Sequence, residues 1–314
     1  MNKRVRPAVD GALAALHGVT RDGQPLSYNR APAPDLAPWV ARLYVAAVDA
    51  PPDHRLECGL FADQAFLRMQ LAGAWTAQTR DGLLSLGRAS LLVGPQSRRM
   101  PITVTGAFVS VGIALRPGAC HVLSALKLHE YVDRIVPMDG FDPAGRRLID
   151  AIPGEGDPEG WLRSLEAALR EQVDRLGRPL PDPVTARFEA LSLRDPTASI
   201  ADFAREVGIE QRRLERLVRR DFGMPPKQVL RRARALDMAS HLRGVADQAE
   251  ADELALRYYD QSHLIREFTE LFGMPPRQFV ATPQPIMTLA LESRQARRLE
   301  AIERLKPGAP RPWE

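Results

Sequence analysis

The sequence predicts an α+β protein with an N-terminal antiparallel β-barrel or jelly-roll-like domain that carries added helices, followed by a C-terminal all-α double helix-turn-helix domain. Three observations predict this fold class. Short apolar and β-branched runs separated by Gly and Pro occupy residues 55–118, as in antiparallel sheets. After residue 118, apolar residues recur at helical spacing. A seven-residue segment beginning at Phe222 recurs 50 residues later, which indicates two copies of one supersecondary unit.

Composition limits the class of protein. The 314 residues are enough for two domains, and hydrophobic and charged contents of 45% and 26% are ordinary for a folded chain. A net charge of +4 is compatible with a polyanionic partner without identifying one. No secretory signal and no apolar run of membrane-spanning length are found. We therefore expect a cytoplasmic protein without a membrane partner.

The N-terminal half is expected to contain strands. Residues 1–38, rich in Pro and Gly, are predicted to be a loose lead-in, and residues 39–150 to form the sensor or dimerisation domain. Gly73 and Gly106 are interpreted as turns between strands. The predicted strands are Phe66–Leu71, Ser90–Val93, Ile102–Thr105 and Phe108–Leu115.

Helical patterns follow. Ala119–Leu128 is expected to be one helix, and Trp161–Leu176 a second, within a helical linker over residues 151–185. Residues 284–314 are predicted to be a C-terminal helical tail. Apolar and basic residues alternate over Ile286–Leu305, which favours a solvated helix or one that packs in a dimer.

The repeat consists of Phe222–Gln228 and Phe272–Gln278, both reading Phe-Gly-Met-Pro-Pro-basic-Gln. In the first copy, Ser199 is placed to cap a helix that ends near Gly208. A second helix then follows over Gln211–Phe222, and Pro226–Leu242 is expected to be a long helix that joins the two units. Its apolar residues fall on one side, whereas Arg212, Arg216 and Arg219 fall on the opposite side, flanked by Arg213, Glu215 and Arg220.

This combination predicts a helix-turn-helix whose second helix enters the major groove of double-stranded DNA. An arginine-rich helix alone would more often be a solvated surface. The duplication and the turn glycine favour DNA binding. The Met-Pro-Pro segments place Lys227 and Arg277 in the first turn of the next helix, where cations and free N–H groups can hold backbone phosphates.

The segment 186–283 resembles the tandem helix-turn-helix domain of AraC/XylS-type transcription regulators. The residues that carry the resemblance are Ile200–Gly208, Leu214–Val218, Phe222–Gly223, Asp260–Phe268 and Phe272–Pro276. The resemblance implies base contacts from the second helix of each unit. By position these are Arg212, Glu215 and Arg216 in the first unit, and Gln261, Ser262, Ile265 and Arg266 in the second. The other candidate DNA-binding residues are Gln211, Arg213, Arg219, Arg220, Lys227, His263 and Arg277.

The N-terminal half is similar, more weakly, to the sensor half of a branch of the same family. Leu92–Gln96, Val111–Gly118 and Arg134–Pro137 carry this likeness. It implies a cupin-like fold that binds a small effector, dimerises, or both. The expected partners are a DNA operator, a small-molecule effector, a second copy of the chain, and RNA polymerase if the protein is an activator.

The second unit departs from the family pattern. Leu254–Asp260 lacks the usual turn glycine, so the second turn is shortened. Charge differs as well: residues 211–234 hold nine basic against two acidic residues, and residues 244–280 hold three against seven. We therefore expect the first unit to anchor the protein on DNA. The alternative is an effector-binding or anti-regulator protein whose DNA binding is impaired.

An enzyme is not expected, and neither catalytic residues nor a cofactor are predicted. Alkyl-transfer repair proteins with this type of domain need several cysteines, and only Cys58 and Cys120 are present. His54, His121 and His129 lack the spacing of a metal site. Five aromatic residues are expected either in the core or around an effector pocket, namely Trp39, Phe61, Phe66, Trp75 and Phe108.

Overall fold

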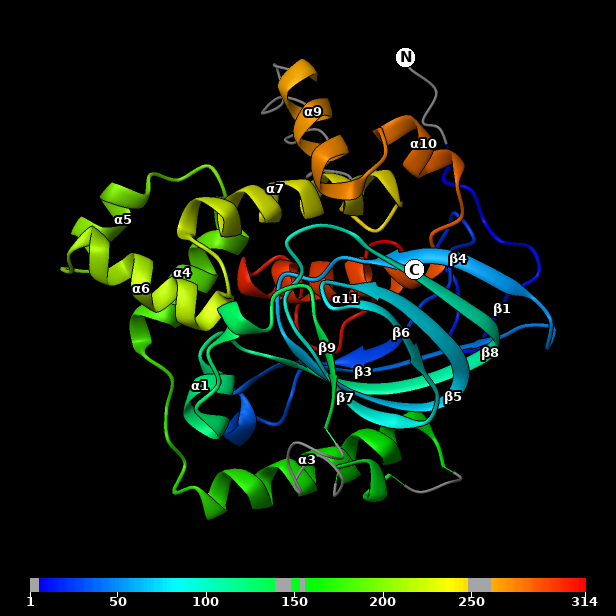
Figure 1. Ribbon diagram of the computed structural model, residues 1–314, viewed down its shortest axis with the longest axis horizontal. Helices are drawn as coiled ribbons and strands as arrows, with labels where there is room; N and C mark the ends of the chain where they lie inside the picture. The colour runs from blue at the N-terminus through cyan, green and yellow to red at the C-terminus, as the bar shows by residue number, and fades with distance from the viewer. Residues whose placement is uncertain (1–5, 139–147, 153–155, 248–260) are drawn as a thin grey trace.

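The computed structural model describes residues 6–138, 148–152, 156–247 and 261–314, and confirms the α+β class. A strongly curved antiparallel sheet from the N-terminal half lies between helix α3 (Pro158–Arg175) and helix α11 (Pro285–Ala301), and further helices gather beyond α11 (Figure 1). The sheet therefore has helical cover on both faces. Within the described ranges no helix is both long and apolar enough to cross a membrane.

Within the described part of the chain the sheet has nine strands in the order β1-β3-β8-β5-β7-β9, with β2 added to β3, β4 to β8 and β6 to β5. On β3, Tyr44, Ala46 and Val48 belong to the core shared with α11, whereas Leu43 and Val45 belong to the core shared with α3. This alternation is the two-residue period of a strand buried on both faces. The strands are β1 (Ala14–Ala15), β2 (Tyr28–Arg30), β3 (Val40–Asp49), β4 (Arg55–Leu60), β5 (Phe66–Thr79), β6 (Gly82–Leu86), β7 (Ala89–Val93), β8 (Met100–Leu115) and β9 (Ile135–Pro137).

Two predicted turns are bulges inside long strands. Gly73 and Gly106 adopt φ of +98° and +73°, a left-handed conformation that also suits turns. They lie beside the register shifts between β5 and β8, which continue for 14 and 16 residues. Ile102–Thr105 and Phe108–Leu115 are consequently one strand. Bulges of this kind bend a strand and increase its twist, in keeping with the strong curvature of the sheet.

The helices follow the predicted pattern closely in the first helix-turn-helix unit. The second helix of that unit has the predicted bounds, and the long helix after it begins and ends at Pro226 and Leu242 as expected. The remaining helices are η1 (Pro34–Leu36), α1 (Ala119–Ser124), η2 (Leu128–Glu130), α4 (Pro183–Arg194), α5 (Ile200–Glu206), α6 (Gln211–Phe222), α7 (Pro226–Leu242), α9 (Gln261–Phe272) and α10 (Pro276–Ala281).

The described part of the predicted lead-in, residues 6–38, is not loose. Thr20, Gln24, Leu26 and Ser27 are almost fully buried, and the Ser27 hydroxyl donates to a carboxylate oxygen of Glu292 in α11 at 2.8 Å. The segment is held in place because β2 pairs with β3 and the Arg21 amide donates to the carbonyl of Trp313, near the C-terminus, at 3.0 Å.

The predicted linker and tail are also parts of the core. Helix α3 buries Leu162, Leu165, Leu169 and Val173 against the outer face of the sheet. Helix α11 is buried along most of its length, including Arg294, Arg297 and Arg298. The prediction of a solvated or dimer-packing tail was wrong, because the charges of these arginines are paired with carboxylates inside the chain and do not face solvent.

Buried ion pairs join the sheet, α11 and the C-terminal helices. Arg294 contacts Asp237 of α7 at 2.6 Å and Asp63, just after β4, at 2.9 Å. Arg297 contacts Asp63 at 3.2 Å and Glu189 of α4 at 2.7 Å. Burial by itself would raise the pKa of Asp63, but the neighbouring arginines lower it to about 2. The sheet is therefore held to α4 and α7, which flank the first helix-turn-helix unit, by charge as well as by apolar packing.

Candidate nucleic-acid interface

The first helix-turn-helix unit is formed by α5 and α6. The Ser199 hydroxyl accepts a hydrogen bond from the Asp202 amide at 3.3 Å and caps α5 as expected. Gly208, with a φ of +72°, lies in the turn before α6. The apolar sides of the helices meet around Phe188 of α4, which contacts the rings of Phe203 and Phe222 edge-to-face at 5.4 Å each. This packing fixes the direction of α6.

Helix α6 has a buried side and a cationic side. Leu214 and Val218 are buried in the core of the unit. The opposite side is exposed and carries Gln211, Arg212, Arg213, Glu215, Arg216 and Arg219. Among the described residues, no carboxylate forms an ion pair with any of these four arginines. Their charge is thus available to an external anion.

Arg220 does not join this surface. Its guanidinium contacts the carboxylate of its neighbour Asp221 at 2.7 and 2.8 Å, and this pairing raises the pKa of Arg220. Asp221 is buried and also accepts from the Thr185 hydroxyl of α4 at 2.7 Å. In the folded chain Arg220 is thus paired within α6, and its partner Asp221 joins α6 to α4; a DNA contact by Arg220 stays a prediction.

Of the basic residues after α6, some are exposed and others are paired or buried within the chain. Lys227 is exposed in the first turn of α7. Arg231 and Arg234 instead pair with carboxylates of α9. Arg232 is buried and donates to the backbone oxygens of Gln96 at 2.9 Å and Asp63 at 2.6 Å. Counting charges along the sequence therefore overestimated the positive surface of this segment.

The second unit is described only from α9 onward. Ser262, His263, Ile265 and Arg266 are exposed, and the exposed fraction of Ile265 is 44%. Arg277 is exposed on the short helix α10. The side chain of Gln261 and the shortened turn at Leu254–Asp260 lie outside the described residues. Glu267 and Glu270 of α9 accept from arginines of α7, so the exposed side of α9 carries less positive charge than that of α6.

Both second helices end against the N-terminal half, and no local sequence pattern predicts this contact. A Cβ added to Gly223, after α6, would lie 2.8 Å from Val132 and 2.9 Å from Pro95. The Arg99 amide donates to the carbonyl of Leu271 in α9 at 2.7 Å, and the rings of Phe61 and Phe272 meet edge-to-face at 5.1 Å. In Figure 1, α6 lies beside α4 and α5, and α9 projects from the opposite end of α7.

The histidines and cysteines singled out in the sequence are the remaining candidate groups. Across the described ranges, no three His, Cys, Asp or Glu residues come together as a potential metal site. His54 contacts Asp10 at 2.9 Å. Cys58 and Cys120 are buried free thiols, and burial raises the pKa of Cys120 to about 12.

Comparison with known families adds to this geometry. Residues 203–282 match a family model described as a helix-turn-helix domain. The chain carries an AraC-type helix-turn-helix domain. This domain includes α6, α7, α9 and α10. Residues 28–137 match a second model, described as a domain of unknown function (DUF6597), which spans the sheet from β2 to β9. No curated protein matches the chain.

Solved structures of other proteins are also distantly similar to the chain. ToxT from Vibrio cholerae is 8% identical with a TM-score of 0.45, and the match covers 76% of this chain and 97% of ToxT. ToxT bound to an unsaturated fatty acid is 9% identical with a TM-score of 0.44, and the match covers 76% of this chain and 94% of ToxT. The AraC-like transcriptional activator CuxR is 16% identical with a TM-score of 0.28, and the match covers 72% of this chain and 85% of CuxR. At these values the similarity carries no ligand or activity over to this chain.

Proposed function

We propose that the protein is a sequence-specific, DNA-binding transcription regulator that is controlled by a small effector bound in its N-terminal half. One observation carries the DNA-binding part. Helix α6 belongs to an AraC-type helix-turn-helix domain, and it exposes Arg212, Arg213, Arg216 and Arg219 on the side opposite its packed residues. Cations held on the outer side of such a helix suit the negatively charged grooves of DNA.

The exposed residues of α6 differ in the role proposed for them. Arg212 and Arg216 are assigned to guanine edges, where a guanidinium donates two hydrogen bonds to O6 and N7. Glu215 is assigned to a cytosine amino group. Arg213, Arg219 and Lys227 are assigned to backbone phosphates, which position the protein without reading sequence.

Helix α9 is proposed to tune specificity more than affinity. Ile265 is an exposed apolar side chain that suits the methyl group of thymine. Ser262 and Arg266 are exposed polar groups on the same helix. Glu267 and Glu270 form ion pairs with arginines of α7, so those arginines are not available to phosphates. The second unit therefore has less positive charge with which to attract DNA.

Salt-dependent DNA binding tests this proposal. The full-length protein is titrated with a fluorescent duplex between 50 and 200 mM salt, and the slope of log K against log salt is expected to be about −0.9 for each phosphate neutralised. Arg216→Ala is expected to weaken binding by about 1–3 kcal/mol. Arg266→Ala is expected to weaken it less. Arg163→Ala, on the exposed side of α3, is the matched control and is expected to have no effect.

The outcomes separate the alternatives. A larger loss with Arg266→Ala than with Arg216→Ala would show that the first unit is not the anchor. No salt-dependent binding at 50 mM salt would favour the effector-binding or anti-regulator protein with an impaired second unit.

A further inference from the structure

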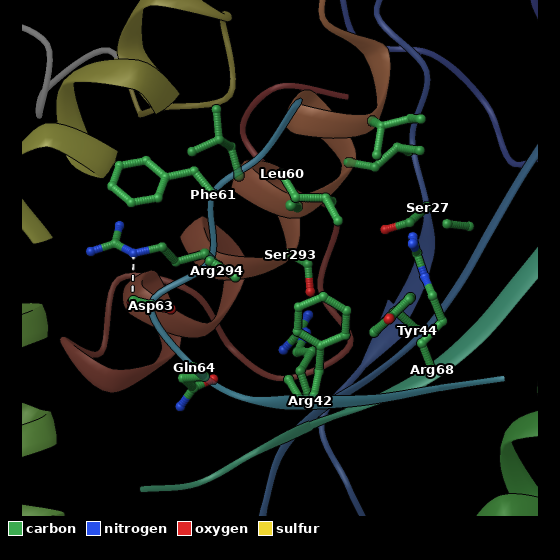
Figure 2. Close-up of a pocket in the computed structure, with 18 of the residues that line it drawn as sticks. Ser27, Arg42, Tyr44, Leu60, Phe61, Asp63, Gln64, Arg68, Ser293 and Arg294 are labelled. Atoms are coloured by element: carbon green, nitrogen blue, oxygen red, sulfur yellow. Dashed lines mark hydrogen bonds and ion pairs between the residues drawn. The ribbon is translucent and has the colours of Figure 1, made fainter. Parts of the chain in front are cut away.

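A cavity of about 90 Å³ lies between the inner face of the sheet and helix α11 (Figure 2). Most of its wall is apolar and comes from Leu60, Phe66, Phe108, Ile286 and Leu289. A single water needs roughly 10–15 Å³ by this measure, so there is room for roughly six to nine non-hydrogen atoms. The cavity therefore suits a compact ligand with an apolar body.

Three of the four arginines around the cavity are neutralised by the chain. Arg42 contacts Glu300 at 2.7 Å. Arg294 and Arg297 are neutralised by the buried carboxylates described above. Arg68, on β5, differs from these three: among the described residues no carboxylate pairs with it, and its Nε atom is buried without a hydrogen-bond partner.

The surroundings of Arg68 hold it in place without neutralising it. Its guanidinium lies 4.3 Å from the centre of the Trp75 ring. The guanidinium also interacts with the Tyr44 hydroxyl, and Figure 2 shows Ser27, Tyr44 and Arg68 gathered at one end of the cavity, away from Asp63 and Arg294. Burial raises the pKa of Tyr44, so its hydroxyl keeps a proton that it can donate.

The strand register builds this arrangement. Tyr44 of β3 and Arg68 of β5 are both paired with Gly112 of β8, which lies between them. A Cβ on Gly112 would lie 2.2 Å from the Cζ atom of Tyr44. The absence of a side chain at Gly112 therefore leaves the space in which the Tyr44 ring crosses the middle strand to reach Arg68.

A buried cation without a counterion is costly, and burial lowers the pKa of Arg68 for this reason. We propose that the cavity binds a small carboxylic acid with an apolar body, whose carboxylate pairs with Arg68 and accepts a hydrogen bond from Tyr44. One guanidinium offers one charge and two parallel donors, which match a carboxylate. A phosphate would bring a second charge into a wall that is mostly apolar.

The ligand would lie against a helix that also holds the DNA-binding domain. Helix α11 contributes Ile286, Leu289 and Ser293 to the cavity. The same helix is tied to α7 through Asp237 and to α4 through Glu189. A ligand that shifts α11 would thus alter the position of the first helix-turn-helix unit. Only this regulatory role rests on the proposed function, whereas binding of the acid does not.

Calorimetric titration of the full-length protein, without DNA, tests the binding. Hexanoate and benzoate, with eight and nine non-hydrogen atoms, are the probes, and their relative affinities distinguish an aliphatic from an aromatic body. Hexanol and benzyl alcohol are the neutral counterparts. We expect at least one acid to bind, its alcohol to bind at least roughly tenfold more weakly, and Arg68→Met to lose about tenfold or more in affinity for the acid. Arg163→Met is the matched control and is expected to bind like the unchanged protein.

Two further measurements guard against a folding defect. Arg68→Met without ligand is expected to keep or raise the melting temperature, because it removes an unpaired buried charge. Gly112→Ala keeps Arg68 and is expected to lower the affinity for the acid, because the added methyl group displaces Tyr44. Equal binding of acids and alcohols, unchanged binding by Arg68→Met, or no binding of either acid up to about 10 mM overturns the proposal. If an acid binds but no DNA sequence is ever bound, the proposed function fails and the ligand site stands.

Discussion

Asp63 is the carboxylate through which the sheet holds helix α11, so replacing it by Asn measures that attachment. The side chain is 17% exposed and lies between Arg294 and Arg297. In Asp63→Asn, Arg294 keeps Asp237 and Arg297 keeps Glu189. The variant thus removes one charge from the network without leaving either arginine unpaired.

The pKa of Asp63 sets the size of the effect. Its value falls from 3.8 to about 2 when the protein folds. A carboxylate whose pKa is lowered by folding adds stability above the unfolded pKa, and that stability is lost as the pH falls through the folded value. At 1.36 kcal/mol for each pKa unit, Asp63 contributes about 2 kcal/mol at neutral pH. About 1 kcal/mol of this is expected to be lost between pH 5 and pH 3.

Urea unfolding at pH 7, 5 and 3 checks these values. The free energy of unfolding of Asp63→Asn is expected to be lower by about 2 kcal/mol at pH 7, with a difference that narrows by about half at pH 3. Asp35→Asn is the control, because Asp35 pairs with Arg170 at 2.6 Å on the surface, where an ion pair contributes little. A difference that is the same at pH 3 and pH 7, or no larger than that of the control, would refute the reasoning.

Three further outcomes are expected. Lys227→Ala should reduce the salt slope of DNA binding by about 1 and leave sequence preference unchanged, and a changed preference in a selected DNA pool would place Lys227 on a base. Ser199→Ala should lower the free energy of unfolding by about 1 kcal/mol through loss of the α5 cap, and an unchanged urea midpoint would show that Ser199 does not stabilise α5. Burial raises the pKa of both Cys58 and Cys120, so neither should react with a thiol reagent at pH 8 until the protein unfolds; fast labelling of the folded protein would contradict this.

Local periodicity was enough to predict the elements of the first helix-turn-helix unit. The bounds of α6 and α7 follow from their apolar spacing and from the prolines that begin α7. Gly73 and Gly106 were misinterpreted because left-handed backbone serves turns and bulges alike. Only the partner strand, far away in the sequence, distinguishes the two.

Partners far apart in the sequence explain the other corrections. Arg294 finds Asp237 and Asp63 at separations of 57 and 231 residues, so its alternation with apolar residues resembled a solvated helix. Arg68 is a single basic residue in an apolar strand, and only the register through Gly112 brings Tyr44 beside it. For Arg220, an adjacent acid competes with DNA, and a helical projection does not show which contact is made.

The most direct test of the DNA-binding claim is selection of bound duplexes from a random pool by the full-length protein and by Arg216→Ala. The proposal predicts that the unchanged protein enriches one motif and that the variant loses or relaxes it at the guanine contacted by Arg216, while Arg163→Ala enriches the same motif. Enrichment of the same motif by Arg216→Ala, or no enrichment by the unchanged protein at low salt, would contradict the claim that α6 reads DNA.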